Sequence, residues 1–148
     1  MTVKEFLQLV RRQDKAIRTC EQELTETRAR AFMLSSPAFG DKVQGNHVSS
    51  LDDVVISLEQ QAQKVKAKWE QYACVRNVAT DLIGTETDAD RKIALYRYYI
   101  MCETWPDVAA ALHVSLRTAY TFHGRGLQDL AKVWPAFEEI YNKNKIVQ

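Results

Sequence analysis

Glycine and proline are so sparse in this chain that two long tracts, residues 2–34 and 50–83, contain neither. Because these residues are the usual breakers of helices, each tract predicts one long helix. Both tracts repeat apolar residues every seven positions, as a coiled-coil seam does. The seam positions are Val3, Val10, Ile17, Leu24 and Ala31 in the first tract, and Leu51, Leu58, Val65, Tyr72 and Ala79 in the second. The tracts therefore predict an antiparallel helical hairpin over residues 1–84.

The ends of these tracts carry helix boundary signals. Thr2 and Glu5 have the spacing of a capping box, Ser50 is a suitable N-cap, and Gly84 is a suitable stop. The connection over residues 35–50 is rich in Ser, Gly, Pro and Asn and lacks periodicity, so we expect an exposed loop there.

Beyond residue 84 the expected helices are shorter. Thr87 with Asp90 suits a helix start, and this helix is expected to end near Glu103. Thr104 to Asp107, with Pro106 in the first turn, then predict a second helix that ends near residue 112.

A tight turn at His113 and Val114 follows, and Ser115 is expected to cap a third helix over about 116–133. Trp134 and Pro135 are expected to separate that helix from a short amphipathic tail over 136–148.

This spacing is typical of a helix-turn-helix over residues 85–135. Its core is expected from five apolar residues, and Trp105 is expected to pack on the preceding helix. The core residues are Val108, Leu112, Val114, Ala119 and Phe122, while the small Ala109 is expected to let the two helices cross closely. The outward positions of the third helix, which can reach base edges in a major groove, are Leu116, Arg117, Thr118, Tyr120 and Thr121.

The turn spacing supports contact with DNA, whereas the modest charge weakens nonspecific binding to phosphates. The whole chain has a formal net charge of +1, so no molecule-wide field attracts nucleic acid. Residues 113–132 hold Arg117, Arg125 and Lys132 against Asp129, a local excess of two positive charges. The alternative is that the three helices form a protein-binding module with an ordinary solvated basic face.

The segment TWPDVAAALHVSLRTAYTFHGRGLQDL resembles the promoter-reading fourth region of bacterial sigma factors. The chain as a whole resembles small phage and prophage transcriptional regulators of the ArpU and RinA kind. This resemblance implies a DNA-binding activator or sigma-like factor for late phage genes. By position it implies that the DNA-facing residues are Ser115, Arg117, Thr118, Tyr120, Thr121 and Arg125. Such proteins often carry Gly in place of His113, and Arg or Lys in place of Thr121.

Other functional classes lack their sequence signals. No apolar stretch is long enough to span a membrane, and no signal peptide core is seen, so we expect a cytoplasmic protein of a bacterial host. Three dispersed cysteines predict reduced packing residues, and the histidines lack the spacing of a zinc site. Without a catalytic or nucleotide-binding motif, we expect neither enzymatic activity nor a cofactor.

The expected partners are double-stranded DNA, the host RNA polymerase and a second copy of the chain. A dimer is favoured because the helical hairpin has more apolar surface than one partner helix covers, with Phe6, Trp69 and Tyr72 as exposed candidates. Two alternative functions are a phage small terminase subunit that recognises packaging-site DNA and a polymerase-binding protein that does not read DNA.

Overall fold

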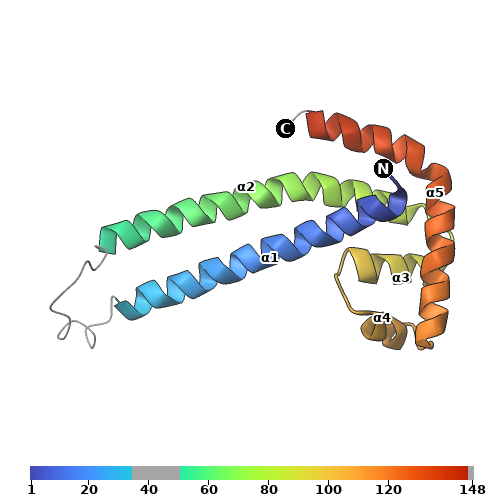
Figure 1. The fold of residues 1–148 in the computed structure, drawn as a ribbon, viewed down its shortest axis with the longest axis horizontal. Coiled ribbons are helices and arrows are strands. Elements are labelled where there is room, and N and C mark those ends of the chain that lie inside the picture. Colours follow the sequence, from blue (N-terminus) through green and yellow to red (C-terminus); the bar gives the residue numbers. More distant parts are fainter. Residues whose placement is uncertain (35–50, 147–148) are drawn as a thin grey trace. The chain divides into compact units, whose positions relative to one another are not determined.

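The computed structural model describes residues 1–34 and 51–146, and every regular element among them is an α-helix (Figure 1). The helices are α1 (Val3–Leu34), α2 (Leu51–Gly84), α3 (Ala89–Tyr99), α4 (Trp105–Ala111) and α5 (Leu116–Ile146). The all-α fold class is therefore confirmed. The expected loop over residues 35–50, with its Ser50 cap, lies outside the described residues.

The chain divides into two compact units: Ala16–Glu70, and Met1–Lys15 together with Gln71–Gln148. The unit boundaries thus fall within α1 and α2, whereas the sequence suggested functional domains over 1–84 and 85–135. The first turns of α1 belong with the C-terminal helices because they share a hydrophobic core with α5.

Within Ala16–Glu70, α1 and α2 contact each other through polar groups as well as through the apolar seam. The indole Nε1 of Trp69 donates to Glu21 Oε1 at 2.6 Å. Ile17 and Leu24 of the seam are buried, whereas Leu58 and Val65 are half-buried. Four other large apolar side chains of this unit are exposed, namely Phe32, Met33, Val55 and Ile56.

The larger unit has an aromatic core at the start of α1. The Phe6 ring lies 4.7 Å from that of Trp134 and 5.1 Å from that of Tyr141, both in α5. The hydroxyl of the buried Tyr72 donates to Asp14 Oδ1 at 3.0 Å. The expectation that Phe6 and Tyr72 are exposed is therefore wrong, since α5 and a buried carboxylate cover them. Trp69, the third candidate, is half-buried.

Helix α5 continues through Pro135, so the predicted break at Trp134 and Pro135 is wrong. The buried Trp134 donates from Nε1 to the Met1 carbonyl at 2.8 Å, and Glu138 pairs with the N-terminal amine at 3.0 Å. These tertiary contacts hold the second half of the helix despite the hydrogen bond that proline removes. The helix bends in that half, as a proline-containing helix is expected to do (Figure 1).

Of two other predicted helix boundaries, the start of α1 is confirmed and the start of α3 is corrected. The capping box at the start of α1 is confirmed, with Thr2 N donating to Glu5 Oε2 at 2.7 Å and Glu5 N to Thr2 Oγ1 at 3.3 Å. The start of α3 is corrected, because Asp88 rather than Thr87 or Asp90 is its N-cap. This helix also ends at Tyr99, four residues before the expected end.

Candidate nucleic-acid interface

Helix α4 begins as predicted. Thr104 is its N-cap and forms a reciprocal capping box with Asp107, while Pro106 occupies the first turn. The helix ends in the paired hydrogen bonds of a Schellman motif: Val114 N donates to Ala109 O at 3.0 Å, and His113 N to Ala110 O at 3.1 Å. The turn is therefore closed by backbone hydrogen bonds, which fix where α5 starts.

His113 occupies the left-handed position that this motif requires, with φ of 54°. Glycine is the usual residue there because a Cβ is unfavourable at positive φ, although histidine tolerates the region better than most residues.

The start of α5 is capped by the predicted serine. Ser115 Oγ accepts from Thr118 N at 3.2 Å and shares a hydrogen bond of 2.9 Å with Thr118 Oγ1. Thr121 Oγ1 donates to the Arg117 carbonyl at 3.0 Å. Three of the hydroxyls expected to face DNA are therefore already engaged within the helix.

The expected core of this region is confirmed in part. Of the five predicted core residues, Val108 and Ala119 are buried, while Leu112, Val114 and Phe122 are half-buried. The small Ala109 is buried as well. Gly126 adds a contact that sequence analysis missed: a Cβ there would lie 2.8 Å from Leu95 Cδ1 of α3. The bare backbone at Gly126 thus allows α5 to approach α3 closely.

An aromatic column joins α1, α3, α4 and α5. The Arg11 guanidinium lies 4.0 Å from the centroid of the Tyr98 ring, which stacks on Trp105 at 4.1 Å. Trp105 in turn lies 5.0 Å from Tyr120 and 4.9 Å from His123 of α5. The expected packing of Trp105 on the preceding helix is confirmed, and this column also fixes the orientation of Tyr120.

His123 is held neutral in this environment. Burial lowers the pKa of its imidazole to about 4, and the nearby Lys4 ammonium contributes in the same direction. Its Nε2 lies 2.8 Å from the Tyr99 hydroxyl, and burial raises the pKa of that phenol. His123 is therefore a packing and hydrogen-bonding residue rather than a cation aimed at phosphate.

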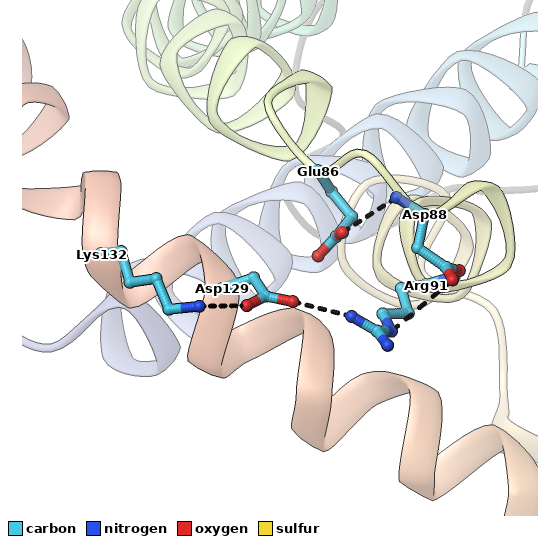
Figure 2. A network of polar contacts seen from close by, with 5 residues as sticks. All are labelled: Glu86, Asp88, Arg91, Asp129 and Lys132. Atoms are coloured by element: carbon cyan, nitrogen blue, oxygen red, sulfur yellow. Dashed lines mark hydrogen bonds and ion pairs between the residues drawn. The ribbon is translucent and has the colours of Figure 1, made fainter.

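Charged residues hold α3 to the side of α5 (Figure 2). Arg91 Nη1 contacts Asp129 Oδ2 at 2.8 Å, and Lys132 Nζ contacts Asp129 Oδ1 at 2.6 Å. The hydrogen bond from Lys132, with the charges of both cations, lowers the pKa of Asp129. The backbone N of Arg91 also donates to the Asp88 cap, so Asp88 acts as a helix cap and Asp129 as a neutralised ion-pair partner.

The predicted DNA-facing residues differ in what they offer to a ligand. Ser115, Leu116, Arg117, Tyr120, Thr121 and Arg125 are exposed, whereas Thr118 is half-buried. We call the surface formed by Leu116, Arg117, Tyr120, Thr121, Gly124 and Arg125 the outer face of α5. Positions three and four apart lie together on a helix, so this surface is continuous.

The segment that contains the outer face carries positively charged but no negatively charged side chains. Residues 108–128 contain no acidic residue, and their only Lys or Arg residues are Arg117 and Arg125. The next carboxylate along α5 is Asp129, which Arg91 and Lys132 already neutralise (Figure 2). An anion approaching the outer face therefore meets cations without competing carboxylates from this segment.

Arg11 is a supporting residue that sequence reasoning missed. Its Nη1 donates to the carbonyls of Tyr98 and Glu103, the latter at 3.1 Å. In sequence it is an ordinary polar position of a long helix, and no local signal connects it with residues about ninety positions away.

The cysteines are free, in agreement with the prediction, but their surroundings vary. Cys74 is exposed, so a packing role is wrong for it, while Cys20 and Cys102 are half-buried. Among the described residues no group of histidine, cysteine and acidic side chains has the arrangement of a metal site.

We compared the chain with models of known families, with curated proteins and with solved structures, and none of them matches it. No helix in the described part of the chain combines the length and apolar character needed to cross a membrane.

Proposed function

We propose that the chain binds double-stranded DNA through α4 and α5, which form a helix-turn-helix with α5 as the recognition helix. The observation that carries this proposal is the outer face of α5. This face follows a tightly hydrogen-bonded turn, is exposed, and carries Arg117 and Arg125 in an acid-free segment. A helix presented in this way suits a major groove.

The particular function we propose is that of a phage-type transcriptional regulator or sigma-like factor that acts on promoter DNA of late genes in the bacterial cytoplasm. The resemblance of residues 104–130 to a sigma promoter-reading region supports this assignment. Such a protein requires neither catalysis nor a cofactor, and the host RNA polymerase is its natural second partner.

Self-association through α1 and α2 completes the proposal. We take these helices to form a coiled-coil hairpin, and the exposed Met33, Val55 and Ile56 provide apolar surface for a second copy. Light scattering at tens of micromolar, above the dissociation constant of a stable dimer, is expected to give twice the chain mass. A higher ring would favour the small terminase alternative, and a monomer would contradict the dimer.

Chromatin immunoprecipitation with sequencing in the native host tests the function directly. Peaks at promoters are expected. A single peak at a packaging site would support the terminase alternative, and the absence of peaks together with co-purification of polymerase would support a partner that does not read DNA.

A further inference from the structure

Two large apolar side chains stand out on the first turns of α5. Leu116 is 45% exposed and Tyr120 is 50% exposed. They are four residues apart and therefore neighbours on the outer face. Each exposes apolar surface to solvent, which is unfavourable unless a partner covers it.

The Tyr120 ring is held in place before any ligand arrives. It contacts Trp105 at 5.0 Å, and Trp105 stacks on Tyr98 at 4.1 Å. A rigid ring loses little conformational entropy on binding. The exposed tyrosine is thus suited to recognition through shape and apolar contact.

The hydroxyl groups next to this apolar pair already form hydrogen bonds within the helix, which limits the kinds of contact that the outer face offers to DNA. The hydroxyl of Thr121 donates to the Arg117 carbonyl, and those of Ser115 and Thr118 bond each other. The outer face therefore offers a guanidinium beside an apolar pair. In a major groove the apolar group on a base edge is the 5-methyl of thymine.

We infer that Leu116 and Tyr120 contact thymine methyl groups, so that the duplex recognised by this chain carries A·T pairs opposite the first turns of α5. This inference rests on the proposed DNA binding. It assigns the two residues a specificity role that the cationic groups do not supply, because arginine prefers guanine.

The test begins with selection of duplexes from a random double-stranded library by the full chain. The enriched duplex is then resynthesised with deoxyuridine in place of each thymine in turn, which removes the methyl and keeps every hydrogen-bonding group. Loss of one buried methyl contact is expected to weaken binding about fourfold at one or two positions.

Substitutions of Leu116 and Tyr120 identify which side chain contacts each thymine methyl group. Leu116→Ala and Tyr120→Ala are each expected to abolish the deoxyuridine effect at one position, while Tyr120→Phe keeps the ring and is expected to keep the effect. Ile140→Ala is the matched control, because Ile140 lies on the same helix and is 47% exposed. It is expected to behave as the wild type does, and circular dichroism checks that each variant is folded.

The outcomes separate the two proposals. If no duplex is enriched, the proposed function fails and the inference fails with it. If an enriched duplex binds equally well with deoxyuridine at every thymine, or if every folded alanine variant of Leu116 and Tyr120 keeps all the deoxyuridine losses of the wild type, DNA binding stands and the thymine inference is overturned.

Discussion

The inner and outer faces of α5 are built from the same stretch of chain and have opposite properties. On the inner face, Ala119 and Leu130 are buried, and Gly126 allows close contact with Leu95 of α3. On the outer face, Leu116 and Arg117 are exposed. The inner residues hold the larger unit together, whereas the outer residues contribute little to its packing.

This difference separates stability from recognition within one helix. Burial of apolar area and close packing are what make a substitution costly to folding. A residue that contributes little to packing, and that lies in an acid-free segment beside a hydrogen-bonded turn, is available to a partner. Substitutions on the two faces should therefore change different measurements.

The largest expected effect compares two leucines of α5. Leu130→Ala removes a side chain that is 1% exposed and is expected to lower the free energy of unfolding by about 2–5 kcal/mol. Leu116→Ala makes the same chemical change on the outer face and is expected to change it by less than about 0.5 kcal/mol. Urea unfolding followed by circular dichroism measures both. Equal losses would mean that the two faces do not differ as described.

The next largest effect is expected on DNA affinity, in a comparison of two arginines of the outer face. In the proposed complex Arg117, near the start of α5, contacts a guanine, so Arg117→Ala is expected to weaken specific binding by about 1–3 kcal/mol and to relax selection at one base pair. Arg125→Ala, about two turns further along, is expected to weaken specific and scrambled duplexes alike and to reduce the salt dependence by about one charge. Titrations at several salt concentrations distinguish these effects.

Neither arginine substitution is expected to alter the unfolding free energy by more than about 0.5 kcal/mol, because both side chains are exposed. Unchanged affinity in both folded variants would contradict DNA recognition by the outer face and would favour the polymerase-binding alternative.

Local signals in the sequence predicted the region around the turn well. The capping box at Thr104 and the cap at Ser115 involve residues three apart, so their hydrogen bonds can be anticipated from spacing. The outward positions follow from helical periodicity once the start of α5 is known. For these reasons six of the seven residues predicted to face DNA are exposed.

The failed predictions for Phe6 and Pro135 involve contacts between residues distant in sequence. Pro135 is a local helix breaker, yet Trp134 and Glu138 bond to the first residue of the chain and keep α5 continuous. Phe6 lies on α1 and is expected from the sequence to be exposed, but rings from α5 cover it. Nothing near Phe6 or Pro135 in the sequence indicates these partners, because tertiary packing can override local preference.

Acid is expected to weaken the inner side of α5 through His123. In the folded chain the pKa of His123 is about 4, whereas an unfolded histidine has a pKa of about 6.5. Between these values the unfolded chain binds a proton that the folded chain does not, so stability falls as pH decreases from about 6.5 to about 4. Allowing for partial solvent exposure, the loss should be about 1–2 kcal/mol.

His123→Gln is the control for this prediction, because glutamine does not titrate and other acid-sensitive groups, such as Asp129, remain in both proteins. Urea unfolding at several pH values is expected to show a steeper decline for the wild type. Parallel declines in the two proteins would mean that His123 is protonated as easily in the folded chain as in the unfolded one.

The smallest expected effect compares Gly124 and Gly126, two residues apart on α5. A Cβ at Gly124 meets no atom within 4 Å, so Gly124→Ala is expected to raise the free energy of unfolding by about 0.5–1 kcal/mol, the ordinary gain in helix propensity. At Gly126 the same gain is opposed by a contact of 2.8 Å with Leu95 Cδ1. Leu95 is fully buried, so Gly126→Ala is expected to give a net loss of about 1 kcal/mol. Thermal and urea unfolding of both variants would measure the opposite signs, and stabilisation by Gly126→Ala would mean that α3 and α5 are not packed as closely as described.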